Sequence, residues 1–265
     1  MVGRTGRKTA ETNTVRLNCS GVRDSSVKTG ANAAGAASML RAMEDAGRFN
    51  RWMAETIAPF IGDRVLEIGA GIGNLTKLLS HGKREYIVTD IDREYLMHLQ
   101  GFTRERPNVS TAICDLAKPD DFEPFRERMD TVVCLNVLEH IEDDRTGLQN
   151  IRSALIPGGR AVVLVPQGAF AFGTFDEVLG HCRRYSRTEL MRKVTDAGFK
   201  IERVLEFNRG TYPGWLLNGK ILRRRTLSRL QLAIFDRFVP LLRPIDRWLP
   251  WPSTSLIVIG VRDSI

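Results

Sequence analysis

Short apolar runs alternate with amphipathic stretches along most of the chain. Runs rich in β-branched residues end at glycine, acidic or asparagine residues, and stretches with apolar positions three or four apart follow several of them. This alternation predicts a doubly wound α/β sheet with helical crossovers. The predicted strands are 65–68, 85–89, 109–114, 130–135, 160–166, 199–207 and 255–261.

Helix signals lie between these runs. The spacing of apolar residues predicts one amphipathic helix over 39–60. Asp92 is placed to cap the helix after the second strand. Ser186, with Glu189 three residues later, is typical of a capping box. Gly198 should end that helix.

Three stretches interrupt the alternation. We expect residues 117–129, which contain Pro119 and Pro124, to form a short irregular connection. We expect 167–180, which is rich in Gly and Phe, to form a loop. The segment 208–253 is longer than a hairpin needs, and its spacing predicts a basic amphipathic helix broken near Pro240 and Pro244. Such a helix suits peripheral contact with an anionic membrane through 209–248, or packing on the domain or on a second subunit. Both interpretations stay open here, the second allowing a homodimer.

Composition indicates a soluble globular protein with one large domain. The chain has 265 residues, 43% of them hydrophobic, and a mean hydropathy of -0.18. We expect one α/β domain over 39–265, which includes 208–253 as a helical insertion. The first residues lack an apolar h-region, and the four cysteines lie far apart. We therefore predict a cytoplasmic protein with reduced thiols, with peripheral membrane association left open.

The net charge of +8 belongs to two appendages. Residues 1–40 carry +4 and residues 209–248 carry +7, so the remainder is at −3. Residues 1–38 have almost no large apolar side chains and predict a disordered basic tail, which also resembles an organelle transit peptide. Aromatic and basic residues of 209–248 do not alternate as a stacking platform, so we do not expect nucleic acid as a partner.

A glycine turn follows the first predicted strand. Gly69, Gly71 and Gly73 alternate with Ala70 and Ile72 before a helix-compatible segment. Glycine would let the backbone close on a ligand, and the new helix brings unpaired N–H groups to the turn. The sixth position of a dinucleotide fingerprint is not glycine, and no lysine followed by Ser or Thr closes the turn. These departures argue against NAD, FAD and a P-loop.

The turn resembles motif I of the class I S-adenosylmethionine (SAM) dependent methyltransferases. Three later segments also resemble sequences of that family. Leu138-Glu139-His140 follows the fourth strand, and Pro157-Gly158-Gly159 precedes the fifth. The sequence is similar to ubiquinone-type methyltransferases, and especially to a bacterial group with a G-H-x-R-R-Y-[ST] segment, matched by 180–186. Members of that group often occur beside glycosyltransferases. The resemblance implies a Rossmann-like, seven-stranded, mostly parallel sheet with an antiparallel last strand.

The resemblance also implies SAM as the cofactor and a set of residues to hold it. The turn would lie under the methionine and ribose parts, Asp90 would accept from the ribose hydroxyls, and Asp115 from the adenine amino group. The cofactor contacts implied are Glu67, Gly69, Ala70, Gly71, Gly73, Asn74, Asp90, Ile91, Asp115, Leu116 and Asn136.

Two of the four histidines are candidates for chemistry. His140 and His181 follow the fourth and fifth strands, so both should lie at the carboxyl edge of the sheet. We predict His140 as a general base and His181 as a substrate contact or alternate base. Glu139 would lie beside the acceptor. Metal-dependent relatives carry an acid where this chain has Asn136, so we predict no metal, although Glu139, His140 and His181 would make three ligands.

Arg183, Arg184 and Tyr185 complete the predicted substrate site. They could clamp a phosphate or carboxylate of the acceptor, or they could cover the edge of the sheet. We predict methyl transfer to a hydroxyl of a small molecule, such as a lipid-linked, quinone-like or glycosylated acceptor. An N-methyltransferase and a SAM-binding, non-catalytic protein recruited to membranes are the alternatives.

Overall fold

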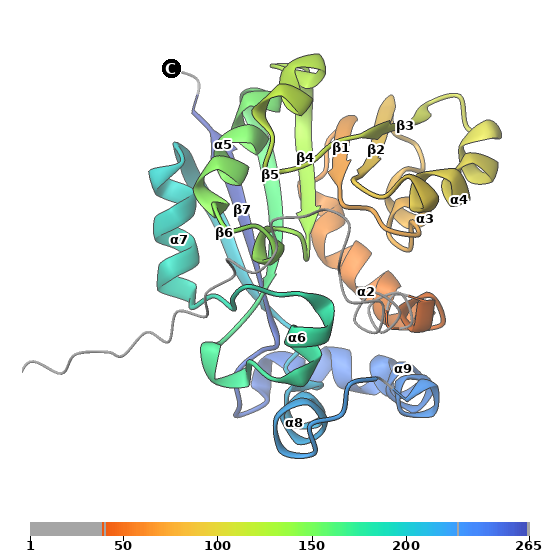
Figure 1. Cartoon of the computed structure of the whole chain (residues 1–265), viewed down its shortest axis with the longest axis vertical. Helices are drawn as coiled ribbons and strands as arrows, with labels where there is room; N and C mark the ends of the chain where they lie inside the picture. Colours follow the sequence, from red (N-terminus) through yellow and green to blue (C-terminus); the bar gives the residue numbers. More distant parts are fainter. Residues whose placement is uncertain (1–38, 40, 227, 264–265) are drawn as a thin grey trace, which may run out of the picture.

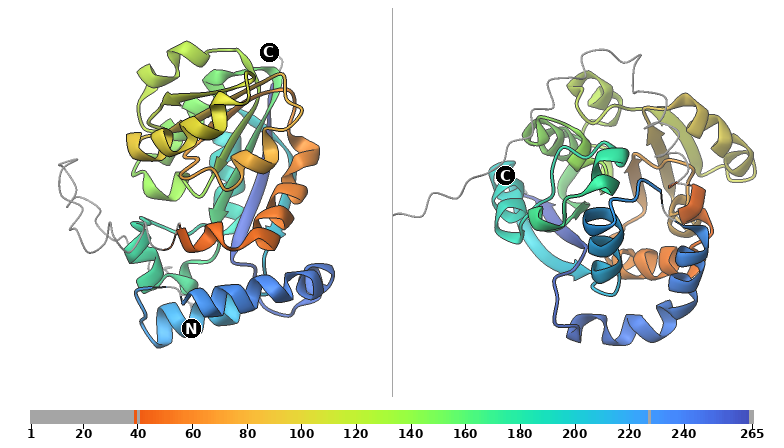
Figure 2. Two further views of the ribbon diagram at one scale, coloured as in Figure 1. Left: turned by 90° about the vertical axis from the view of Figure 1, so that its right-hand side faces the viewer. Right: turned by 60° about the horizontal axis from the view of Figure 1, so that its bottom comes forward.

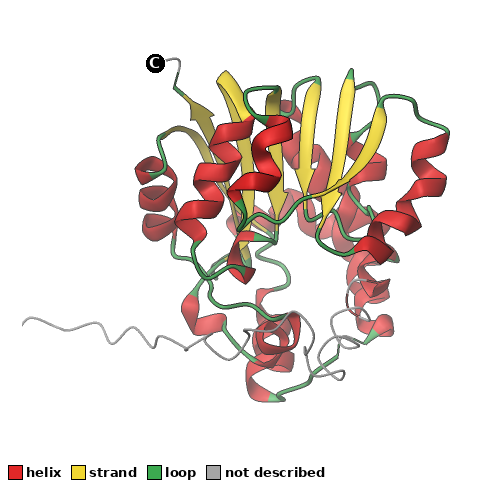
Figure 3. Cartoon of the chain, turned by 45° about the horizontal axis from the view of Figure 1, so that its top comes forward, coloured by secondary structure: helices red, strands yellow, loops and turns green. Residues whose placement is uncertain are grey.

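A seven-stranded sheet forms the centre of the molecule (Figures 1 and 3), in a computed structural model that describes residues 39, 41–226 and 228–263. The tail predicted for 1–38 lies outside the described residues. The strand order is β3-β2-β1-β4-β5-β7-β6. The strands are β1 Arg64–Ile68, β2 Glu85–Asp90, β3 Val109–Ile113, β4 Met129–Leu135, β5 Leu155–Pro166, β6 Phe199–Phe207 and β7 Ser255–Arg262.

Pairing in the sheet confirms the predicted topology. Strands β1 to β5 pair in parallel, whereas β7 runs antiparallel between β5 and β6. Ile68 at the end of β1 is in register with Thr89 of β2 and Cys134 of β4. The loops that leave these three strands therefore start at one level, which is where ligands bind in doubly wound sheets.

Helices cover both faces of the sheet (Figure 3). On one face α5 and α7 pack with the 3-10 helix Pro119–Phe125; on the other lie α2, α3, α4 and α9. The two cores draw on alternate strand residues, as Leu66 and Val65 of β1 show. The helices are α2 Gly47–Ile57, α3 Thr76–Leu79, α4 Arg93–Arg104, α5 Asp144–Ala154, α6 Thr174–Leu179, α7 Arg187–Asp196, α8 Tyr212–Trp215 and α9 Arg229–Ile245.

Three predictions of local structure need correction. The helix predicted over 39–60 is divided, because Ala46 leaves the helical region with ψ of 57° before α2 begins. The connection 117–129 contains a 3-10 helix that starts at Pro119. The loop 167–180 contains α6, whose Asp176 accepts a hydrogen bond from the N–H of Gly173 at 3.0 Å and so caps the helix.

The insertion 208–253 differs from its prediction as well. It forms α8, a π-helix Leu216–Ile221, α9 and a 3-10 helix Asp246–Trp248, and α9 runs through Pro240 and Pro244 without a break. Both prolines are exposed. Because proline has no N–H, the carbonyls of Asp236 and Pro240, four residues earlier, lose their helical partners, and the helix nevertheless continues. The predicted caps are confirmed, since Asp92 accepts from the N–H of Glu94 and Ser186 from that of Glu189.

Among the described residues, no helix has both the length and the apolar character that crossing a bilayer requires.

Candidate cofactor and acceptor site

The glycine turn lies between β1 and α3 at the carboxyl edge of the sheet. Gly69, Gly71 and Gly73 have φ of 68°, 56° and 78°, a region that favours glycine. A Cβ on Gly69 would lie 2.3 Å from Cγ2 of Val137, and one on Gly73 would lie 2.3 Å from Cδ2 of Leu99. Two of the glycines are thus required by packing against neighbouring side chains, a reason in addition to room for a ligand.

Asp90 ends β2 directly beside this turn. Its Oδ2 accepts from the N–H of Gly71 at 2.8 Å and its Oδ1 from the N–H of Asp92 at 2.9 Å. Burial raises the pKa of the Asp90 carboxyl above its usual value, and the two N–H donors partly oppose that rise. A carboxylate offers about four acceptor positions, so Asp90 can still accept from two hydroxyls.

The side chain next to Asp90 is apolar and exposed. Ile91 has 65% of its surface accessible, although it lies between a buried strand and a helix cap. A nucleoside has ribose hydroxyls, which can donate to the Asp90 carboxylate, and a flat nucleobase, which can pack on the apolar surface of Ile91. The residues present therefore fit the nucleoside part of SAM.

Glu67 supports the turn from inside the protein. Its Oε2 accepts from the hydroxyl of Thr76 at 2.7 Å and from that of Tyr86 at 3.0 Å. Burial raises the pKa of Glu67 to about 7, against the effect of these two hydrogen bonds. The backbone of Ala70 is fixed by donation to the carbonyl of Thr89 at 3.0 Å. Glu67 thus anchors the start of α3, and direct contact between its carboxylate and SAM stays a prediction.

The other predicted cofactor residues line the same edge. Asp115 accepts from the N–H of Ala117 at 3.0 Å and pairs with Lys118 at 3.4 Å, so its carboxylate also orders its own loop. Leu116 has a buried side chain, which leaves its backbone as the part that could meet a ligand. Asn136 has φ of 55°, a conformation that asparagine tolerates well, and its side chain is exposed. Asn74 is half-buried within the glycine turn.

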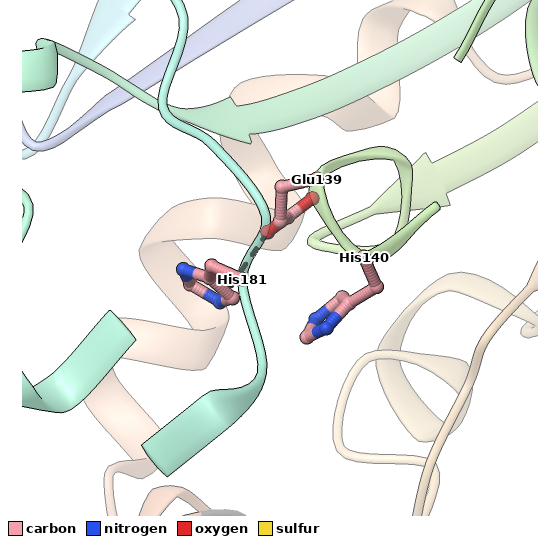
Figure 4. Close-up of side chains that lie close together, drawn as sticks. All are labelled: Glu139, His140 and His181. Carbon is pink, nitrogen blue, oxygen red and sulfur yellow. Dashed lines mark ion pairs between the residues drawn. The ribbon is translucent and has the colours of Figure 1, made fainter. Parts of the chain in front are cut away.

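Three side chains predicted for chemistry come together beyond β4 (Figure 4). Glu139 and His140 lie on the 3-10 helix Leu138–His140, and His181 follows α6. The two imidazole centroids are 4.8 Å apart with their planes at 80°. Nε2 of His181 lies 3.8 Å from Oε1 of Glu139. Sequence reasoning placed both histidines at this edge, and the structure makes them neighbours.

Each histidine is held through its Nδ1. That atom of His181 is 2.7 Å from Oδ1 of Asp176, and that of His140 is 3.2 Å from the carbonyl oxygen of Gly180. A carbonyl only accepts, so Nδ1 of His140 carries the proton in this contact. The neutral ring of His140 then has its lone pair on Nε2, the atom that a general base uses.

Glu139 is the most deeply buried member of the cluster. Its side chain has no exposed surface, and neither carboxylate oxygen has a hydrogen-bond partner in the part of the chain that the structure describes. Burial raises its pKa to about 7, although the charge of His181 opposes the rise. One ligand atom each from Glu139, His140 and His181 lie within 4.8 Å of one another, so the cluster could also hold a metal ion.

The segment 180–186 is bound to two buried aspartates that sequence reasoning did not identify. Asp176 accepts from Nε of Arg184 at 2.8 Å in addition to contacting His181. Asp144 accepts from Arg183 at 3.0 Å and from the hydroxyl of Tyr185 at 2.9 Å. Arg184 and Tyr185 are buried, so these contacts favour the covering role for both.

The contact of Arg183 with an acceptor stays a prediction, since its side chain keeps 27% of its surface exposed. The signal that could have revealed Asp176 is its position, three residues after Gly173 at a helix start. No sequence signal pairs Asp144 with Arg183, because they are 39 residues apart.

Comparison with known proteins gives the class of protein that this chain resembles. A family model described as a methyltransferase domain matches residues 66–161. The chain is 27% identical over 178 residues to the highly reducing polyketide synthase stpks1 of Strobilurus tenacellus, which is 56% of this chain and 6% of that protein. It is 24% identical over 112 residues to the ubiquinone biosynthesis O-methyltransferase of Aeromonas salmonicida, which is 42% of this chain and 47% of that protein. The chain thus spans less than half the length of these two curated relatives.

A solved structure shares the fold. The S-adenosylmethionine dependent methyltransferase of Mesorhizobium loti superposes with a TM-score of 0.56 at 14% identity, over 79% of this chain and 96% of that chain. The strand order, the glycine turn beside Asp90 and the matching family model agree with one another. The chain therefore carries a methyltransferase domain in the fold of the class I S-adenosylmethionine-dependent methyltransferases, and this domain implies SAM as the cofactor.

Proposed function

We propose that the protein transfers the methyl group of SAM to a hydroxyl of a small-molecule acceptor, with His140 as the general base. SAM supplies a methyl group on a sulfonium centre that is ready for displacement. The observation that supports the proposal is the pair of histidines beyond the end of β4. Strand β4 lies beside β1, which leads into the glycine turn, so the pair is next to the predicted cofactor site. The similarity to the Aeromonas salmonicida relative, which is named an O-methyltransferase, supports the choice of a hydroxyl.

His140 has the orientation that the role needs. Its Nδ1 donates to Gly180, so Nε2 can take the acceptor's proton as the oxygen gains the methyl group. His140 is exposed, whereas the side chain of His181 keeps only 7% of its surface accessible. Asp176 fixes the ring of His181, which then positions the acceptor beside His140. Proton transfer of this kind contributes about 10² to 10⁴ in rate.

The test is His140→Ala, with His98→Ala on the exposed face of α4 as the matched control. Both variants are incubated with labelled SAM and a lipid extract, and SAM affinity is measured by calorimetry. We expect turnover to fall about a hundredfold or more in His140→Ala while SAM affinity stays within a factor of two, as removal of a base predicts. Unchanged turnover would exclude His140 as the base.

A divalent cation is a second candidate for activating the hydroxyl. Two observations favour it: the carboxylate of Glu139 has no hydrogen-bond partner among the described residues, and both histidines make Nδ1 contacts of the kind that orient metal-binding imidazoles. Metal analysis of the purified chain, and turnover before and after chelation, separate the two candidates. Loss of turnover on chelation with recovery on adding a cation would support the second.

Two further alternatives remain from the sequence. N-methylation is distinguished by the chemical class of the labelled product. A SAM-binding protein without catalytic activity, recruited to membranes through 209–248, would bind SAM and give no methylated species from any extract. A homodimer formed through the insertion is tested by the mass of the protein in solution.

A further inference from the structure

Helix α9 has two apolar faces. Leu232, Phe235 and Val239 point inward and pack with the core that contains α2. The opposite side of α9, continued by the 3-10 helix Asp246–Trp248, carries six large apolar side chains spaced by three or four residues, each between 48% and 72% exposed. We call this set the outer stripe, and its members are Leu230, Ile234, Phe238, Leu241, Ile245 and Trp248. Ordinary packing explains the inner face and leaves the outer stripe without a cover among the described residues.

A second exposed apolar group lies on the π-helix of the insertion and the loop before α6. Leu217, Ile221 and Leu222 are between 48% and 70% exposed, and Phe170 is 70% exposed. The ammonium of Lys220 lies 3.7 Å from the centroid of the Phe170 ring. Figures 1 and 2 show α8 and α9 on the same side of the molecule, beyond the end of the sheet. The insertion therefore presents apolar side chains from two helical elements.

All exposed charges of the insertion are positive. The acids of 208–253 are Asp236 and Asp246, and both are buried. Their carboxylates accept from the N–H groups of Phe49 and Gly210, at 2.8 and 2.9 Å. The basic residues are Arg209, Lys220, Arg223, Arg224, Arg225, Arg229, Arg237, Arg243 and Arg247.

Two of these arginines already have acidic partners, Arg209 on Glu206 and Arg243 on Glu55. Arg247 stacks on the exposed ring of Trp248, with 4.7 Å between the guanidinium carbon and the ring centroid. Arg223, Arg224, Arg229 and Arg237 are exposed and add positive charge to this surface. An apolar stripe with cationic flanks and an exposed tryptophan is the pattern of helices that lie in a membrane interface.

From these observations we propose that the outer stripe and its basic flanks dock on the surface of an anionic phospholipid bilayer. Leucine, phenylalanine and tryptophan side chains enter the acyl boundary, while arginines extend to the lipid phosphates. A second copy suits the surface less well, because a two-fold contact would bring its arginines against arginines. A nucleic acid bound to the arginines would leave the six apolar side chains of the outer stripe exposed to water.

The docking surface lies on the same side as the candidate site. The insertion connects β6 to β7, and because β7 is antiparallel, it must leave and return at the carboxyl edge of the parallel strands. The glycine turn and the histidine pair occupy that edge. An acceptor with a lipid chain would then reach the site from the docked side. Docking itself does not rest on the proposed methyl transfer.

The experiment is flotation of the full chain with vesicles, without SAM. Vesicles of phosphatidylcholine are compared with an equimolar mixture of phosphatidylcholine and phosphatidylglycerol. We expect binding to the anionic vesicles that weakens as salt is raised. Replacing Arg223, Arg224 and Arg237 by Gln should weaken it about fivefold each, roughly a hundredfold together.

The apolar part is tested with Phe238→Ser and Leu241→Ser, each expected to weaken binding about tenfold. Met97→Ser on α4, 58% exposed, is the matched control and should bind like the unaltered chain. A blue shift of tryptophan emission on binding should disappear in Trp248→Phe. Circular dichroism checks that each variant is folded.

Three results would overturn the proposal. They are no binding to anionic vesicles, equal binding to neutral and anionic vesicles, and a dimer whose dissociation follows from the Phe238 and Leu241 substitutions. Flotation would succeed or fail whether or not the protein methylates anything, so its outcome is separate from that of the activity assay.

Discussion

Replacing Glu139 by Gln should change how stability depends on pH. The carboxyl is fully buried, its oxygens lack hydrogen-bond partners among the described residues, and burial raises its pKa to about 7 from 4.5. An acid whose pKa is raised on folding binds more protons in the folded state between those two values. Stability therefore falls as pH rises through this window.

The magnitude follows from the size of the shift. Each pKa unit corresponds to about 1.4 kcal/mol, so Glu139 should cost the unaltered protein about 3 kcal/mol above pH 7 relative to acid conditions. Glutamine does not titrate. The difference in unfolding free energy, variant minus unaltered chain, should thus grow by about 3 kcal/mol between about pH 4.5 and about pH 7. The raised pKa of Glu67 is common to both proteins and cancels.

Urea unfolding at several pH values, with a chelator present, measures this difference. The buried amide of the variant adds a cost that does not change with pH, so only the slope is interpreted. Glu142→Gln, an exposed substitution on the same loop, should shift stability by less than about 0.5 kcal/mol throughout. Parallel curves for Glu139→Gln and the unaltered chain would refute the reasoning, because they would mean that the carboxyl is not protonated in the folded protein.

Two further predictions concern named contacts. Asp90→Asn should weaken SAM binding about tenfold to a hundredfold, the loss expected for hydrogen bonds to a charged acceptor, with calorimetry as the measurement; unchanged affinity would exclude the ribose contact. Asp176→Asn should lower the unfolding free energy by about 3 to 5 kcal/mol, because Arg184 would lose its buried partner. Burial alone would raise the pKa of Asp176, but the contacts with His181 and Arg184 lower it overall. The stability that the Asp176 carboxylate contributes is therefore lost as pH falls through its pKa in the folded protein. Thermal unfolding beside the exposed control Glu177→Gln measures it, and equal melting temperatures would contradict it.

The strands could be predicted because their pattern is local. The run 199–207 predicts a strand with the bounds that β6 has in the structure, Phe199–Phe207. The start of β5 was missed because Pro157-Gly158-Gly159 is typical of a turn, yet it lies within Leu155–Pro166. Gly158 has φ of 78°, and the pairing with β4 shifts register between Met129 and Thr131, so the strand absorbs the irregularity.

The histidine pair could be predicted in part for a similar reason. His140 and His181 each follow a parallel strand, and topology alone brings the ends of β4 and β5 together. The partners of these histidines have at most a weak local signal, which for Asp176 is its position three residues after Gly173. Asp176 belongs to a six-residue helix with no clear period, and the helix depends on its side-chain cap and on tertiary packing.

The segment 180–186 shows how a sequence motif can build a site without touching the ligand. Asp176 receives both His181 and Arg184, and the guanidinium carbon of Arg184 lies 4.8 Å from the centroid of the Trp215 ring. Trp215 ends α8 and leads into the π-helix of the insertion. One buried carboxylate therefore connects the orientation of an imidazole in the site to the segment that carries the docking surface. A change in how the insertion packs would reach His181 through three successive contacts, from Trp215 to Arg184, to Asp176 and to His181, which gives acceptor binding a physical route to depend on docking.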